Sequence, residues 1–190
     1  MTLVLAFATP SYALIAADSG RFDLVQQRWL PPVMKIWQCE SILVAKAGEG
    51  SSADPVMPLL ASQLHQSGLT DTSFQAAILG EMPALHERKA AMCKKNGLAP
   101  QKVRLALIAA TAGAKVQTFS CDTRHPLQSK DGCLAVVGAG MDPVFMQAQA
   151  TRPTTFEGLE QAKAWASNLL EIAIPYHRDA LRGPVSVRGS

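Results

Sequence analysis

The 190 residues include 18 Lys and Arg against 15 Asp and Glu, and 48% of them are hydrophobic. Such a chain can bury a substantial core, which excludes a disordered segment and predicts one domain over residues 1–190. A net charge of +3, without a long run of Lys or Arg, argues against nucleic acid as a partner.

The first 17 residues are almost wholly apolar and permit two interpretations. A secretory signal peptide is one, and it would make the chain a secreted protein of another function. Against it, no Lys or Arg precedes the apolar stretch, and Pro10 and Ser11 interrupt it. The stretch is also shorter than the ~20 apolar residues of a membrane span. We therefore expect a β-hairpin and no membrane association, with strands at 3–8 and 12–17.

The geometry of this hairpin yields the first functional expectation. If it folds symmetrically about Pro10, the numbers of cross-strand partners sum to 20, and Thr2 faces Asp18. Directly opposed residues lie ~5 Å apart, so a threonine and a carboxylate meet beside a chain terminus. Both strands lack polar alternation, which predicts a sheet covered on both faces.

Further along the chain, strand blocks alternate with helical blocks. Strands are expected within 35–47. Asp54 is a candidate N-cap, with Pro55 after it and Gly68 as the stop, and a second helix spans 72–95 with a bend at Pro83. The next strands are expected at residues 102–110, 115–121 and 132–137.

The C-terminal part predicts one more helix and one more strand. The helix starts at the capping-box pattern of Thr154 and Glu157 and ends at Pro175, and residues 185–187 form an edge strand. Strand and helix blocks in this order favour an α+β fold, a four-layer αββα sandwich of two antiparallel sheets with helices outside.

Metal and cofactor sites have little support in the sequence. The cysteines are too few and too irregularly spaced for a disulfide scaffold, so we expect free thiols and a cytoplasmic protein. Cys121, His125 and Cys133 fall around one predicted hairpin, but a zinc site there would lack paired spacing and a fourth ligand. His65, His86 and His177 have no Ser or Cys partner identifiable from spacing. No loop has the phosphate-binding glycine pattern, and we expect no cofactor and no metal.

Four segments resemble one known family, in the family's order. They are "TLVLAFATPSYALIAADSGRFD" from Thr2, "KIWQCESILVAKAGEGSSAD" from Lys35, "VVGAGMDPVF" from Val136 and "YHRDALRGPVSV" from Tyr176. Together they resemble the proteasome β subunits, which are N-terminal-nucleophile (Ntn) hydrolases. The length and missing propeptide resemble the bacterial branch, such as the betaproteobacterial proteasome homologue.

The resemblance implies a threonine peptidase with a defined set of site residues. Removal of Met1 exposes Thr2, whose hydroxyl is the nucleophile and whose α-amine, with a pKa near ~8, is the base. Lys35 polarises the hydroxyl and Asp18 orients Lys35. The resemblance assigns Asp179 to support the amine and the Gly48 N–H to hold the oxyanion.

The resemblance also implies assembly and partners. The subunits are expected to form a homo-oligomer of stacked heptameric rings, with Thr2 facing an inner chamber. Substrates are peptides or unfolded proteins, delivered by an ATP-dependent unfoldase or cap. Lys46 falls at the floor of the substrate pocket, where an ammonium would favour acidic side chains.

Two departures from the family pattern leave a second function open. The family's serine in the glycine-flanked loop is here Ala139, and the serine after the Arg-Asp pair is here Arg182. Both losses weaken the network around the amine, so a ring-forming scaffold without activity is the alternative. Taken singly, Thr2, Asp18 and Lys35 also fit ordinary structural roles, and Asp179 fits an ion pair with a neighbouring arginine.

Overall fold

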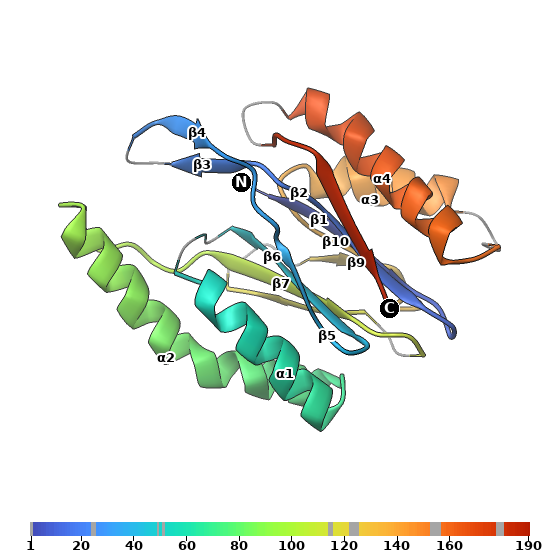
Figure 1. The fold of residues 1–190 in the computed structure, drawn as a ribbon, viewed down its shortest axis with the longest axis horizontal. Helices are drawn as coiled ribbons and strands as arrows, with labels where there is room; N and C mark the ends of the chain where they lie inside the picture. Colours follow the sequence, from blue (N-terminus) through green and yellow to red (C-terminus); the bar gives the residue numbers. More distant parts are fainter. Residues whose placement is uncertain are drawn as a thin grey trace.

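Two antiparallel sheets stack face to face in the computed structural model, with two helices covering each outer face (Figure 1). The structure describes residues 2–23, 26–48, 50, 52–113, 116–121, 126–152, 157–177 and 181–190. This arrangement confirms the predicted αββα sandwich. No helix of the described part is both long and apolar enough to cross a membrane.

The first sheet has the strand order β11-β2-β1-β10-β9, and every pairing is antiparallel. Its strands are β1 (Leu3–Ala8), β2 (Ala13–Asp18), β9 (Leu127–Gln128), β10 (Leu134–Gly138) and β11 (Val185–Gly189). The predicted C-terminal edge strand is confirmed by β11, which lies at the edge next to β2.

The second sheet has the order β5-β6-β7-β8, and a separate hairpin pairs β3 with β4. The strands are β3 (Arg21–Asp23), β4 (Arg28–Leu30), β5 (Ile36–Cys39), β6 (Ile42–Gly48), β7 (Leu105–Ala110) and β8 (Gln117–Ser120). Sequence analysis missed the β3–β4 hairpin, because three-residue strands are too short to show an alternating pattern.

Helices α1 (Met57–Ser67) and α2 (Asp71–Lys95) cover the second sheet, and α3 (Met141–Thr151) and α4 (Leu159–Tyr176) cover the first (Figure 1). Asp54 is not the N-cap of α1. It begins a short 3-10 turn, and Val56 occupies the cap position. Helix α2 continues through Pro83, and α4 includes Pro175. Thr154 lies outside the described residues.

Apolar packing occurs in three layers, which explains the lack of polar alternation in β1 and β2. Even-numbered residues of β1, such as Val4 and Ala6, pack between the two sheets. Odd-numbered ones, such as Leu3 and Leu5, pack against α3 and α4. A third cluster joins the second sheet to α1 and α2. A strand buried on both faces must be apolar throughout.

The β1–β2 register differs by one residue from the prediction. Observed partners sum to 21, as in Val4 opposite Ala17 and Ala8 opposite Ala13. Tyr12 belongs to the turn, because the Tyr12 N–H donates to the Thr9 hydroxyl and the Thr9 N–H donates to the Tyr12 carbonyl. Thr2 and Asp18 are therefore not directly opposed partners, and the prediction that they face each other across the strands was wrong.

Candidate active site

Several chain segments meet at one end of the sandwich, where β1 begins and β2, β6 and β10 end (Figure 1). Thr2 lies there, immediately before β1, and only 6% of its surface is exposed. Its position follows from the β1 pairing, which continues to Leu3 opposite Gly138. A polar residue is thus held at the margin of an apolar core, beside the chain terminus.

Asp18 ends β2 and is almost completely buried. One carboxylate oxygen accepts a hydrogen bond of 2.8 Å from the Leu3 N–H, and the other accepts one of 3.0 Å from the Gly20 N–H. Two backbone donors on different segments fix the carboxylate, since charge-assisted hydrogen bonds are short and directional. The one-residue register shift therefore brings Asp18 to the backbone of Leu3, and its side chain still reaches the site.

Lys35 precedes β5 and joins the other two residues. Its Nζ donates to Thr2 Oγ1 at 2.8 Å and to Asp18 Oδ2 at 3.1 Å. The exposed fraction of the side chain is 7% for Lys35 and zero for Asp18. Burial is the largest effect and lowers the Lys35 pKa, while the Asp18 carboxylate opposes this shift. Thr2, Asp18 and Lys35 are thus brought into one buried hydrogen-bonded cluster.

The backbone of Thr2 is held by the end of β10. The Ala139 N–H donates to the Thr2 carbonyl oxygen at 2.9 Å. Gly138 has φ +105°, and a Cβ there would overlap the same carbonyl oxygen. A glycine is therefore required for close approach at this point. The sequence drew attention to the Gly138-Ala139-Gly140 loop only through its missing serine. The contact of this loop with the Thr2 carbonyl was not predicted.

Gly140, the N-cap of α3, lies directly against the His177 side chain. A Cβ on Gly140 would be 2.5 Å from His177 Nε2. His177 follows α4, so the glycine loop is enclosed from the helix side as well. Sequence spacing gave no signal for this contact, because the two residues are distant in the chain and the contact depends on a missing side chain.

Gly48 and Lys46 lie on the second sheet, across from Thr2. Gly48 ends β6 with φ +96°, and a Cβ built on Gly138 would be 3.0 Å from the Cβ of the adjacent Ala47. Lys46 is buried, and its Nζ donates 2.8 Å to the Gly50 carbonyl and forms a 2.6 Å ion pair with Asp54. Its charge lowers the Lys35 pKa slightly further.

Two residues of the sequence predictions, Asp179 and His125, lie outside the described residues. Arg182 is described, and its guanidinium lies 4.8 Å from the centre of the Trp29 ring in β4. Within the described part, no group of three His, Cys, Asp or Glu side chains is placed to hold a metal. The four cysteines are free thiols.

Comparison with known proteins shows similarity of fold. No family model and no curated protein matches the sequence. Eukaryotic HslV from Trypanosoma brucei superposes with a TM-score of 0.65 at 12% identity over 98% of both chains. Anbu (ancestral beta-subunit) from Yersinia bercovieri has a TM-score of 0.55 at 14% identity, covering 99% of this chain and 81% of Anbu.

A second Anbu structure gives the same result. The Gly-1 mutant of Anbu from Hyphomicrobium sp. strain MC1 superposes with a TM-score of 0.57 at 13% identity, over 98% of this chain and 80% of Anbu. These identities are too low to establish a shared activity. The chain therefore has the four-layer αββα sandwich fold of HslV and Anbu.

Proposed function

We propose that the protein is an N-terminal-threonine peptidase that hydrolyses peptide bonds. The observation that supports this most strongly is the 2.8 Å hydrogen bond from Lys35 Nζ to Thr2 Oγ1, in a cluster buried with Asp18. Burial of an ammonium, a carboxylate and a hydroxyl together is costly in desolvation, and such clusters with a perturbed pKa are typical of functional sites. The shared fold and the family resemblance of the sequence support the same assignment.

In the proposed reaction, Thr2 supplies both nucleophile and base once Met1 is removed. Thr2 Oγ1 attacks the carbonyl carbon of the substrate while its proton passes to the free α-amine. That amine then protonates the departing substrate nitrogen, and an ester remains on Oγ1. Water, activated by the same amine, hydrolyses the ester and restores the hydroxyl.

Lys35 and Asp18 have supporting roles in this mechanism. The Lys35 ammonium donates to Oγ1 and stabilises the negative charge that develops there during attack. Asp18 fixes the ammonium in this position through its 3.1 Å ion pair. Because the Lys35 and Asp18 side chains are buried, these interactions are stronger than they would be at the surface.

Three further roles are proposed for residues around the cluster. The Gly48 N–H holds the oxyanion of the tetrahedral intermediate, and Asp179 supports the α-amine. Lys46 lines the substrate pocket and favours acidic side chains. The ion pair of Lys46 with Asp54 competes with a substrate carboxylate, so this preference depends on displacing or sharing Asp54.

The proposal includes a compartmentalised assembly in the cytoplasm. The fold shared with HslV and Anbu and the sequence resemblance support a homo-oligomer in which Thr2 faces an inner chamber. The resemblance extends this to stacked heptameric rings of the bacterial branch, fed by an ATP-dependent unfoldase or cap. Native mass spectrometry of the purified protein counts the subunits directly.

An inactive ring-forming scaffold is the second candidate function. Ala139 stands where the family has a serine, and Arg182 contacts Trp29 in place of the other serine. Both substitutions remove hydroxyl groups from the surroundings of the proposed amine. A scaffold would keep the fold and the assembly without turnover.

Hydrolysis of fluorogenic peptides separates the two candidates. The wild-type chain, expressed so that Met1 is removed, is assayed against a panel with acidic, basic and apolar residues before the cut. Thr2→Ala is the matched control and must show no hydrolysis. Turnover that persists in Thr2→Ala, or its absence from correctly processed wild type, would contradict the proposed peptidase.

A further inference from the structure

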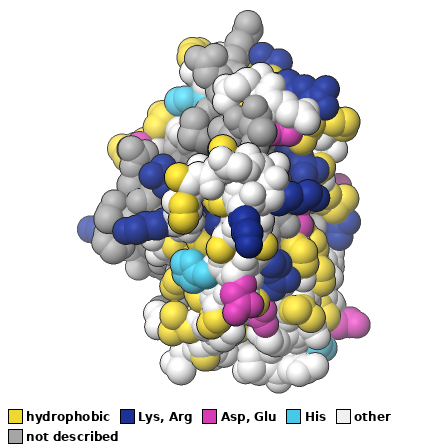
Figure 2. All heavy atoms as spheres, turned by 90° about the vertical axis from the view of Figure 1, so that its left-hand side faces the viewer, with side chains coloured by type: hydrophobic (Ala, Val, Ile, Leu, Met, Phe, Trp, Pro, Cys, Tyr) yellow, Lys and Arg dark blue, Asp and Glu magenta, His cyan; other side chains and the backbone are white. Residues whose placement is uncertain are grey.

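Ser19 directly follows Asp18 at the end of β2, and only 3% of its surface is exposed. Figure 2 shows the side of the molecule where β3, β4 and the end of α2 lie, with Lys and Arg side chains distributed over its surface. Unlike those side chains, Ser19 is covered by its neighbours. It can therefore influence the candidate site only through the residues that it contacts within the fold.

The peptide group between Ser19 and Gly20 connects two members of the cluster. Its N–H donates to Asp18 Oδ2 at 3.0 Å, and its carbonyl accepts a hydrogen bond of 3.0 Å from the Val33 N–H. Val33 lies two residues before Lys35. Because a peptide group is planar, its N–H and carbonyl oxygen have a fixed relative orientation. A tilt of this one peptide would disturb both the Asp18 carboxylate and the segment that carries Lys35.

The side chain and the backbone of Ser19 anchor this peptide to Pro184. Ser19 Oγ donates to the Pro184 carbonyl at 2.7 Å, and the Ser19 N–H donates to the same oxygen at 3.2 Å. A carbonyl oxygen has two lone pairs and can accept both hydrogen bonds. Pro184 precedes Val185, which pairs with Asp18 across β11 and β2. The proline ring fixes its own φ, so the acceptor belongs to a stiff part of the chain.

The contact between residues 19–20 and 182–184 is tight at two points. A Cβ on Gly183, which has φ +87°, would be 2.5 Å from Ser19 Oγ. A Cβ on Gly20 would be 2.5 Å from the Arg182 carbonyl oxygen. The Arg182 guanidinium lies 4.8 Å from the centre of the Trp29 ring, which joins this segment to the β3–β4 hairpin. The Ser19 hydroxyl is therefore held in a closely packed position.

We infer that Ser19 is a positioning residue of the proposed peptidase. Its hydroxyl holds the Ser19–Gly20 peptide, and that peptide holds the Asp18 carboxylate and the segment of Lys35 where the ammonium reaches Thr2. This inference rests on the proposed function and adds a residue to its machinery. A serine with a purely structural role would affect stability alone, whereas a positioning residue also affects the rate of each correctly folded chain.

Ser19→Ala removes only the hydroxyl, and the Pro184 carbonyl keeps the Ser19 N–H as a donor. We expect kcat to fall about tenfold and KM to change less than about twofold, because Ser19 acts on the charge that develops during attack. Rates are divided by the fraction of chains that a peptide epoxyketone labels after prolonged incubation, so that unfolded chains do not count. An unchanged kcat per labelled chain would overturn the inference.

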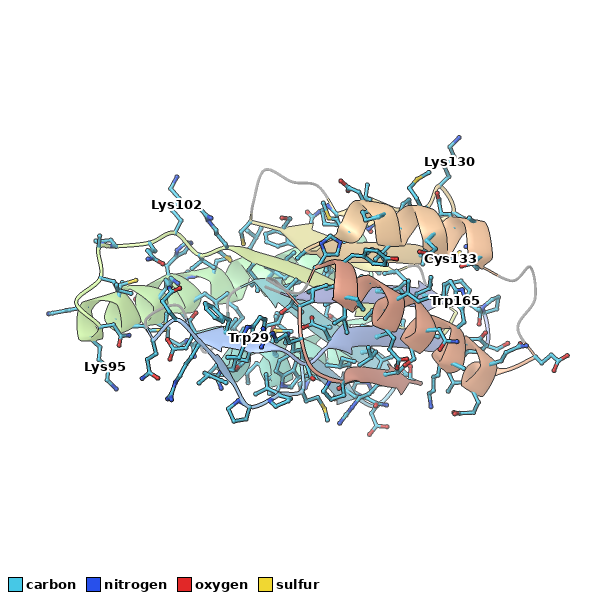
Figure 3. The ribbon with its side chains drawn as sticks, turned by 90° about the horizontal axis from the view of Figure 1, so that it is seen from above. Trp29, Lys95, Lys102, Lys130, Cys133 and Trp165 are labelled. Carbon is cyan, nitrogen blue, oxygen red and sulfur yellow. The ribbon has the colours of Figure 1, made fainter. Side chains whose placement is uncertain are left out.

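Thr9→Ala is the matched control, because it also removes a hydroxyl that donates to a backbone carbonyl, here that of Tyr12 at 3.1 Å. This turn is at the opposite end of the β1–β2 hairpin. Trp165, which contacts Phe7 close to that turn, and Trp29 of the β3–β4 hairpin lie apart in Figure 3. Thr9→Ala should change kcat per labelled chain less than about 1.5-fold. Equal losses in the two variants would contradict a specific role of Ser19.

Gly183→Ala and Gly68→Ala test the contact from the other side. Both glycines have positive φ, +87° and +76°, but a Cβ meets Ser19 Oγ in the first and nothing within 4 Å in the second. Both variants therefore strain the backbone, and only Gly183→Ala also displaces Ser19. We expect kcat per labelled chain to fall about tenfold in Gly183→Ala and less than about twofold in Gly68→Ala. Similar values would argue against the assigned contact.

The double variant of Ser19→Ala and Gly183→Ala separates hydrogen bonding from packing. Removal of the hydroxyl makes room for the new methyl group, so the thermal midpoint should recover part of the loss seen in Gly183→Ala. The rate should stay about tenfold below wild type, because the hydrogen bond to Pro184 is still missing. Recovery of the rate together with the midpoint would overturn the inference, because packing alone would then explain both.

The same measurements distinguish a failure of this inference from a failure of the proposed function. Processed wild type that neither hydrolyses peptides nor is labelled would overturn both. Hydrolysis by wild type and by Ser19→Ala with equal kcat per labelled chain would overturn only the role of Ser19. The expected result is hydrolysis by wild type, with the loss of rate confined to the variants that alter the Ser19 contact.

Discussion

Two buried lysines, Lys35 and Lys46, form ion pairs in this molecule, and their surroundings differ. The side chains are about equally covered, with 7% and 6% exposed. The partner of Lys35 is fully buried and fixed by two backbone N–H groups, whereas Asp54, the partner of Lys46, has 43% of its side chain exposed. Solvent therefore screens the second pair far more than the first.

The two lysines also differ in the third group that each contacts, and this difference affects reactivity. Lys35 also donates to the Thr2 hydroxyl, and Lys46 donates to the Gly50 carbonyl. A hydroxyl next to a desolvated ammonium is easier to ionise, whereas a carbonyl has no proton to lose. Burial of a lysine is thus insufficient to indicate a reactive site; the identity and exposure of its partners decide.

The largest expected effect is on activity at Thr2. Thr2→Ala should reduce peptide hydrolysis at least about 1,000-fold, because it removes the nucleophile while leaving the fold in place. Thr2→Ser keeps a hydroxyl and should retain measurable turnover. Initial rates with a fluorogenic peptide, together with circular dichroism of each variant, check both expectations. A Thr2→Ser variant as inactive as Thr2→Ala would argue against the hydroxyl as nucleophile.

Removing each carboxylate compares the stability of the two pairs. Asp18→Asn leaves the Lys35 ammonium buried without a counter-charge and should lower the free energy of unfolding by about 3 to 5 kcal/mol. Asp54→Asn should cost about 1 kcal/mol or less, because its pair is half open to solvent. Urea denaturation at pH 7 measures both. Comparable losses in the two variants would show that the burial difference has no energetic consequence.

Gly138→Ala tests the backbone clamp on Thr2. The new methyl group would overlap the Thr2 carbonyl oxygen at a backbone conformation that alanine disfavours. We expect a loss of about 2 kcal/mol in unfolding free energy and displacement of Thr2, with turnover reduced accordingly. Gly50→Ala is the control, since a Cβ there meets nothing within 4 Å. Thermal melts of both variants, with peptide hydrolysis rates, measure the difference.

The smallest effect is a pH dependence of stability caused by Lys35. Its pKa in the folded chain lies below the ordinary value of 10.5. Between those two values the unfolded chain binds more protons, so the free energy of unfolding should rise with pH in that window. Lys35→Met should lose this rise. Urea titrations from pH 7 to 10.5 compare the two proteins, and parallel curves would contradict the assignment.

Much of the fold was predictable because it depends on local patterns. Local patterns predicted a strand at 3–8, strands within 35–47 and a helix at 72–95. The structure has β1 at Leu3–Ala8, β6 at Ile42–Gly48 and α2 at Asp71–Lys95. The register of the β1–β2 hairpin was not predictable in this way. It depends on whether Tyr12 belongs to the turn or to the strand, and a hydrogen bond to the Thr9 side chain places Tyr12 in the turn. A one-residue change in a turn moves every pair in the hairpin.

The candidate site likewise has parts that the sequence predicted and parts that it did not. The sequence predicted that Thr2 and Asp18 meet, and they do share Lys35, although through side chains and not through direct opposition across the strands. The hydrogen bond from the Ala139 N–H to the Thr2 carbonyl was not predictable, because every residue type except proline has a backbone N–H. The pairing of Lys46 with Asp54 was missed for another reason: the pattern favoured Asp54 as a helix cap.

Covalent labelling of the N-terminal residue tests the central claim most directly. Purified protein is analysed by intact mass spectrometry before and after treatment with a peptide epoxyketone, which requires both a free amine and a hydroxyl on the same residue. We expect a chain lacking Met1 that gains one inhibitor, with the adduct on Thr2 and reduced labelling in Lys35→Met. A processed chain with a free Thr2 amine that remains unmodified would contradict it.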